Sequence, residues 1–230
     1  MTLKRSAINR SIDAARAFFG DVGLPLPPWA DWSPQDWATA GAEYDEVRTV
    51  RLGWDVTDFG SGDLEHVGRT IFTLRNGRHN DPGHPKTYAE KAMCLFPRQA
   101  SVIHCHRHKR EDIICRHGPG VDIQLWQATP EGGLAEGGLT VSVDGCATAM
   151  QAGETSRLAC GQSICVPPLV YHRFWGAGDS PTLSMEVSSV CDDLTDNLFL
   201  DDGERFPAID EDEPRRWVLC SEYDHEERSV

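Results

Sequence analysis

Apolar residues near the start of the chain follow a helical repeat. Ile8, Ile12, Ala15 and Phe19 recur at intervals of three and four residues, as on one face of an amphipathic helix. We therefore predict a helix over residues 6–19.

A second helix start follows a proline-rich turn, LPLPPWADW. Ser33 can cap a helix, and Pro34 suits its first position, because the amide hydrogen that proline lacks has no partner there. This helix should run to about Ala42. Residues 1–45 are thus expected to form a helical extension in front of the main body of the chain.

After residue 45 the pattern changes to short runs rich in β-branched and aromatic residues. The first run, VRTVRLGWDVTDFG, is predicted to be a strand ended by glycines. Further runs recur about every ten residues, separated by Gly, Pro, Asn or Asp, as in a sandwich or barrel. They are GRTIFTLRNG, AEKAMCLFP, ASVIHCH, EDIICRHG, VDIQLWQAT, LTVSVDG, ETSRLACG, SICVPPLVYHRFWG and TLSMEVSSV. We predict an all-β barrel over 46–195 and an irregular acidic tail over 196–230 packed on it.

Length and composition fit one domain, here residues 1–230, because 230 residues with 40% hydrophobic content can build one substantial core. None of the eight cysteines forms a Cys-x-x-Cys pair. Cysteine usually behaves as a small buried apolar residue in a reducing compartment, and we expect that role here.

Charge narrows the range of partners. Acidic residues outnumber basic ones by 36 to 22, giving a net charge of −14. Such a surface repels nucleic acid and anionic membranes. No run approaches the roughly 18 apolar residues that a membrane helix needs, and the N-terminal segment lacks the apolar core of a signal peptide. We expect a cytoplasmic protein without a nucleic-acid or membrane partner.

Candidate metal ligands lie in the middle of the chain. His104 and His106 are two residues apart, so on a strand both imidazoles point to the same face. The polar run RHKR then forms a turn, and EDIIC begins the returning strand. Glu111 can therefore lie beside the two histidines.

A second segment offers a fourth ligand. Gly161 leads into a β-branched strand that Pro167 ends, and His172 follows five residues later. Three neutral imidazoles and one carboxylate suit Mn, Fe, Co, Ni or Zn. Without a thiolate the set disfavours a closed structural zinc site, and octahedral geometry would leave two positions open.

The two segments resemble the signature motifs of the cupin superfamily. They fit HxH-x4-E-x6-G and G-x5-P-x4-H, with the four candidate ligands at the ligand positions. The chain departs from the superfamily pattern at Arg98 and Leu169, where glycines are usual, and at Gly176, where asparagine is usual. None of these is a ligand, so they put only the local backbone shape in question. The resemblance implies a double-stranded β-helix, or jelly roll, with one divalent ion in its mouth.

A closer resemblance covers nearly the whole chain. The opening KRSAINRSIDAARAFFGDVGLPLPPWADWSPQDW, then YAEKAM, HxHxHKxEDII, PPxxxH, EVSSVCDDLTDN and RFPAIDEDEP, is similar to the cupin-type D-lyxose isomerases. This implies interconversion of D-lyxose and D-xylulose, and often of D-mannose and D-fructose. It also implies manganese as the usual ion and a homodimer acting on a monosaccharide.

The expected reaction moves a proton between C1 and C2, for which a carboxylate base is needed. Glu204, in the family-like tail, is the first choice for that base, with Glu186 next. Lys109 lies between two predicted ligands and could shuttle the proton between O1 and O2. Glu186, Arg205 and Trp175 are candidates for binding the sugar.

Other functions stay open from sequence alone. An Fe(II) cupin dioxygenase can use the same four ligands. A cupin phosphosugar isomerase would need a basic phosphate cradle, which Arg107, Lys109 and Arg110 could form. A sugar-sensing or storage cupin is a third alternative. The second carboxylate and the chain-long resemblance favour the isomerase, without choosing between an enediolate and a hydride shift.

Overall fold

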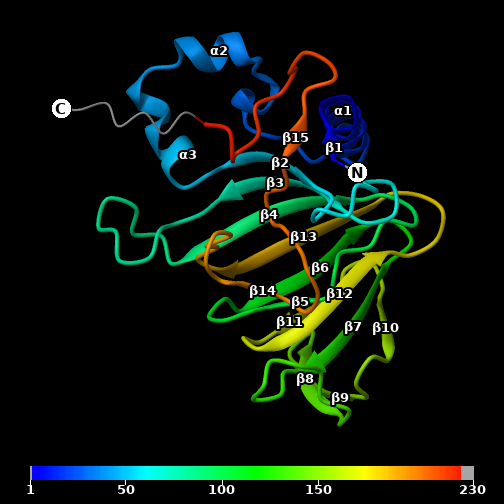
Figure 1. Ribbon diagram of the computed structural model, residues 1–230. Helices are drawn as coiled ribbons and strands as arrows, with labels where there is room; N and C mark the ends of the chain where they lie inside the picture. Colours follow the sequence, from blue (N-terminus) through cyan, green and yellow to red (C-terminus); the bar gives the residue numbers. More distant parts are fainter. Residues whose placement is uncertain (1, 224–230) are drawn as a thin grey trace.

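Two β-sheets that face each other organise the computed structural model, which describes residues 2–223 (Figure 1). In the described residues the larger sheet has the strand order β2-β3-β4-β13-β6-β11-β8-β9. Its strands are β2 (Gly53–Thr57), β3 (Arg69–Arg75), β4 (Tyr88–Leu95), β6 (Glu111–His117), β8 (Leu139–Val143), β9 (Cys146–Met150), β11 (Ser163–Val166) and β13 (Thr182–Ser189).

The smaller sheet has the order β10-β7-β12-β5-β14. Its strands are β5 (His104–His106), β7 (Val121–Gln127), β10 (Thr155–Leu158), β12 (Val170–Gly176) and β14 (Asn197–Phe199). Apolar side chains from both sheets meet between them, among them the fully buried Ile113, Ile123, Leu125 and Ile164. The predicted all-β cupin architecture, with few helices, is therefore confirmed.

The N-terminal helices lie against the larger sheet, at the side of β2 and β3 (Figure 1). Helix α1 (Arg5–Asp21) confirms the first predicted helix, and its Ile8, Ile12 and Phe19 are buried. Phe19 stacks on Trp54 of β2, with ring centroids 6.2 Å apart. This packing covers part of the outer face of the sheet.

The second predicted helix also exists, but it is shorter than expected. Helix α2 (Pro34–Thr39) begins with a capping box between Ser33 and Asp36. It ends before a short 3-10 helix, η2 (Ala42–Tyr44). Another 3-10 helix, η1 (Pro28–Asp31), precedes α2. None of the helices in the described residues is long and apolar enough to cross a membrane.

The predicted strand over residues 47–60 is wrong in its first half. Residues Asp45–Thr49 form helix α3, and the strand begins only at Gly53. Val47 and Val50 have helical rather than alternating spacing, and both are buried against Leu52 and Trp37. Packing on the N-terminal helices thus outweighs β-branched propensity, and the helical extension continues to Thr49.

Other expectations also need correction. Only His104–His106 of ASVIHCH is a strand, Pro167 and Pro168 separate β11 from β12, and β9 has no counterpart in the sequence-based prediction. The cysteines are all free, but Cys146 and Cys160 are exposed rather than buried.

The C-terminal segment runs back across the barrel, and its described part contains two short strands where an irregular tail was expected. Strand β14 pairs antiparallel with β5, and β15 (Ile209–Asp210) pairs in parallel with β1 (Leu3–Lys4). We call residues 196–206 the strap, because they cross from β5 to β2. Residues 224–230 of the predicted tail lie outside the described residues.

Two departures from the cupin motifs have a clear backbone consequence. Arg98 and Leu169 stand where the motifs have glycine, and both adopt left-handed φ values, of 64° and 59°. The backbone shape is therefore retained without glycine. Leu169 also donates its amide hydrogen to the carbonyl of His106 at 2.8 Å, which joins the turn before β12 to a predicted ligand.

Strain at Leu169 predicts a stability difference between two variants. Leu169→Gly and Leu169→Ala both remove the side chain, which is 44% exposed, but only glycine relieves the left-handed backbone. Because that conformation costs a residue with a Cβ roughly 1 kcal/mol, Leu169→Gly should be about 1 kcal/mol more stable than Leu169→Ala. Denaturant unfolding measures this, and equal stability would contradict the strain.

Candidate metal centre

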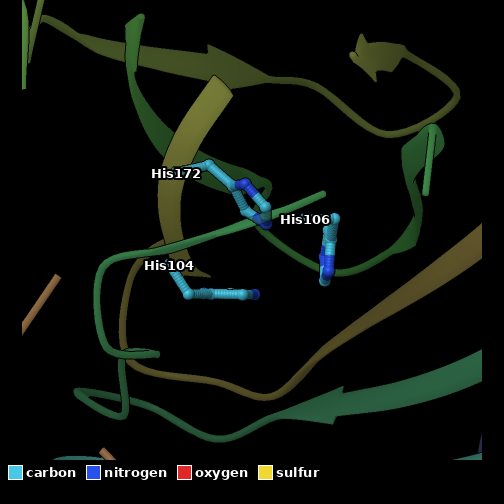
Figure 2. Close-up of side chains that lie close together, drawn as sticks. All are labelled: His104, His106 and His172. Atoms are coloured by element: carbon cyan, nitrogen blue, oxygen red, sulfur yellow. The ribbon is translucent and has the colours of Figure 1, made fainter. Parts of the chain in front are cut away.

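Three histidines converge from neighbouring strands of the smaller sheet. His172 on β12 pairs directly with His104 on β5, and His106 lies two residues further along β5. Their candidate ligand atoms all lie within 4.8 Å of one another. Figure 2 shows the three imidazoles arranged around one space. The predicted two-residue spacing therefore does place both β5 histidines on the face of the third.

Backbone contacts fix two of these rings in a form that can bind a cation. His104 Nδ1 lies 3.0 Å from the carbonyl of Val102, and His172 Nδ1 lies 3.1 Å from that of Val170. A ring that donates from Nδ1 keeps a lone pair on Nε2. Burial lowers the pKa of His104 well below its usual value and also lowers the pKa of His106. The imidazoles of His104 and His106 are therefore held neutral, which is the form that binds metals.

Glu111 reaches the same space from the larger sheet, at the start of β6. Its Oε1 lies 2.9 Å from His172 Nε2 and 3.3 Å from His106 Nε2. All three atoms are buried without a hydrogen-bond partner in the described residues. Lone pairs that face one another in this way repel, and a cation among them would satisfy all three. The donor set fits a divalent metal ion.

Lys109 joins Glu111 to a second buried carboxylate. Its ammonium donates to Glu111 Oε2 at 2.7 Å and to Glu186 Oε1 at 3.0 Å. Burial alone would lower the pKa of Lys109, but the two carboxylates raise it above its ordinary value. Burial alone would raise the pKa of Glu111, but the Lys109 ammonium lowers it well below its usual range. Both partners are thus charged.

The charges continue along the larger sheet. Lys91 on β4 pairs in register with Glu186 on β13, and its ammonium lies 4.0 Å from Glu186 Oε1 and 3.6 Å from Asp193 Oδ2. Asp193 in turn accepts from Arg205 at 3.1 Å and 3.2 Å, and Arg205 also pairs with the buried Asp55. Positive and negative groups therefore alternate from Glu111 to Asp55.

A cavity of about 50 Å³ lies between the histidines and this row of charges. Arg205 lines it, and Arg205 Nη1 is buried without a partner in the described residues. Lys91 and Asp193 form a wall shared with a larger cleft of about 960 Å³. The apolar side chains that close the cavity are Phe59, Ile71, Met93, Phe174 and Phe199.

Several predicted site residues meet in this cavity: the four ligands, Lys109, Glu186 and Arg205 all line it. Glu204 and Trp175 do not. Glu204 is exposed on the strap, where its amide donates to the carbonyl of Phe59 at 3.0 Å. Trp175 follows the inward-facing Phe174 on β12, so strand alternation turns it to the opposite face.

The structure also brings in residues that the sequence did not single out. Lys91 and Asp193 complete the row of charges, and Phe59 and Phe199 form part of the wall. Only the register of β4 with β13, and the path of the strap, place them there. By contrast, Arg107 and Arg110 are exposed, and Lys109 is occupied by two carboxylates. In the described residues these three cations form no phosphate cradle.

Comparison with known proteins identifies the family of this chain. A family model described as D-lyxose isomerase matches residues 3–223. The chain belongs to the D-lyxose isomerase family. It is 45% identical to a D-lyxose/D-mannose isomerase of Escherichia coli O157:H7 and 44% identical to one of Serratia proteamaculans. Each match covers 96% of this chain and 98% of the relative. The chain is therefore a sugar isomerase.

Solved structures support the fold. An L-ribose isomerase of Geodermatophilus obscurus matches with a TM-score of 0.61 at 17% identity, over 91% of this chain and 99% of that one. The L-ribose isomerase of Acinetobacter sp. DL28 in complex with L-ribose matches with a TM-score of 0.60 at 15% identity, over 91% and 98%. At this identity the likeness shows a shared cupin-like architecture.

Removing one ligand should abolish stoichiometric metal binding. His172→Ala deletes a buried imidazole whose Nε2 faces the candidate ion position, and we expect affinity to fall by more than about 100-fold. His108→Ala is the control, because His108 lies in the same segment but is exposed. Metal content after dialysis measures the difference, and equal retention by both variants would contradict the ligand assignment.

Proposed function

We propose that the enzyme interconverts D-lyxose with D-xylulose, and D-mannose with D-fructose, using one divalent ion, with manganese expected. Family membership and the names of the two relatives support the substrates. The observation that carries the proposal is one cavity that holds a metal-type donor set and a separate carboxylate, Glu186.

His104, His106, Glu111 and His172 would hold the ion. When bound, it would act as a Lewis acid toward the sugar carbonyl and the neighbouring hydroxyl, which makes the proton on C2 more acidic. The apolar wall around the site would limit access of water to the reacting carbons.

Glu186 is the base that we propose, in place of Glu204. It is 5% exposed, lines the cavity and accepts hydrogen bonds from Lys109 and from Ser188 Oγ at 2.9 Å. Glu186 would take the proton from C2 and return it to C1. Glu204 is exposed and outside the cavity lining, so it could act only after the strap rearranged.

Lys109 and Arg205 would complete the reaction site. The Lys109 ammonium fixes both Glu111 and Glu186, and its raised pKa suits it to donate hydrogen bonds to O1 and O2 of the sugar while the proton moves between them. Arg205 is clamped by Asp55 and Asp193, so its unpaired Nη1 is available for a sugar hydroxyl.

A direct assay tests the function. Protein reconstituted separately with Mn, Co, Ni, Fe or Zn should convert D-lyxose to D-xylulose, as followed by chromatography, and a chelated sample should not. The proposal fails if the ketose forms with none of these ions. Loss of deuterium from C2-labelled sugar into water would distinguish proton transfer from a hydride shift.

Paired variants test the base. Glu186→Gln should lower kcat by about 10²–10⁴-fold, because the amide cannot accept the C2 proton. Glu204→Gln is the matched substitution and should retain near-normal turnover. Metal content is measured for both variants, so that a lost ion is not mistaken for a lost base. Normal turnover by Glu186→Gln, with loss of turnover in Glu204→Gln, would show that Glu204 on the strap is the base.

A further inference from the structure

Asp196 fastens the strap to the turn that carries two site residues. It is 6% exposed and lies just before β14. Its carboxylate accepts the amide hydrogens of His108 at 2.8 Å and Lys109 at 3.0 Å, and its carbonyl accepts that of Arg107 at 3.0 Å. One residue therefore holds three of the four residues of the turn between β5 and β6, which begins directly after His106 and includes Lys109.

The same carboxylate also faces His106. Asp196 Oδ2 lies 3.8 Å from His106 Nδ1, the ring nitrogen turned away from the candidate ion. The corresponding nitrogens of His104 and His172 already contact backbone carbonyls at 3.0 Å and 3.1 Å. In the described residues His106 Nδ1 has no hydrogen bond, and Asp196 is the acceptor that faces it.

We propose that Asp196 is a positioning residue for the metal centre, acting through His106. A carboxylate behind a ligand imidazole fixes the ring orientation and tautomer, and it makes the ring a stronger donor to the metal. Asp196 would also hold the backbone of Lys109. It would therefore position both the predicted ligand His106 and the ammonium that joins Glu111 to Glu186. The inference rests on the metal centre of the proposed function but not on the identity of the sugar.

A neighbouring aspartate provides a matched control. Asp192 is in the same loop, and its carboxylate accepts from Leu194 N at 3.1 Å and Thr195 Oγ1 at 2.6 Å. Its carbonyl accepts the amide hydrogen of Asp196 itself at 3.1 Å. Asp192 thus stabilises the loop by capping it, but no contact of its side chain with the histidines is found in the described residues.

The experiment compares Asp196→Asn with Asp192→Asn in the full-length protein. Calorimetric titration with Mn²⁺ should show 10–100-fold weaker binding for Asp196→Asn, and binding within about threefold of the parent for Asp192→Asn. With Co²⁺, only Asp196→Asn should change the visible absorption spectrum, which reports ligand geometry. Thermal unfolding of the metal-free proteins shows how much each substitution weakens the loop.

Asp196→Ser guards against a purely structural effect, because serine can still cap a backbone amide but offers no carboxylate to His106. It should bind Mn²⁺ as weakly as Asp196→Asn. Parent-like affinity in Asp196→Asn or Asp196→Ser, or an equal loss in Asp192→Asn, would overturn the inference. If the parent protein binds no metal, both the metal centre and the role of Asp196 in it are wrong. If the metal affinities behave as expected but no sugar is converted, only the proposed function fails.

Discussion

The rest of the site depends on one interaction, the pairing of the Lys109 ammonium with the buried carboxylates of Glu111 and Glu186. A carboxylate removed from water is costly unless a cation compensates it, and losing one partner of a buried pair typically costs about 3–5 kcal/mol. Glu111 and Glu186 are each less than 6% exposed. Lys109 allows Glu111 to face the histidines and Glu186 to lie buried nearby.

This arrangement divides the chemistry between the two sheets. The smaller sheet supplies three imidazole nitrogens from β5 and β12, and the larger sheet supplies Glu111, Glu186 and Lys91 from β6, β13 and β4. The histidines lie together on one wall of the cavity, whereas the charged groups on the other wall alternate in sign. The packed cores on either side then fix the distance between Glu111 and Glu186, because close-packed interiors resist small displacements.

The sequence predicted the parts of this site that depend on local spacing. The two-residue interval of His104 and His106 and the turn before Glu111 follow from strand geometry, and α1 follows from its apolar repeat. Glu186 was identified, but whether it faces the cavity depends on the register of β13 with β4 and β6, which one sequence does not reveal. Glu204 and Trp175 were selected by neighbourhood in sequence, and the path of the strap and strand alternation place them elsewhere.

The strap lines one side of a space of about 50 Å³, enough for a few water molecules but not for a monosaccharide. Side chains or the strap must therefore yield each time a sugar enters or leaves, and such steps often limit turnover in isomerases and other enzymes with closed sites. Asp196 ties the strap to the His106 turn, so a strap movement that admits a sugar would also displace a predicted metal ligand. If the ion and the sugar favour the same arrangement of this turn, each would strengthen the binding of the other.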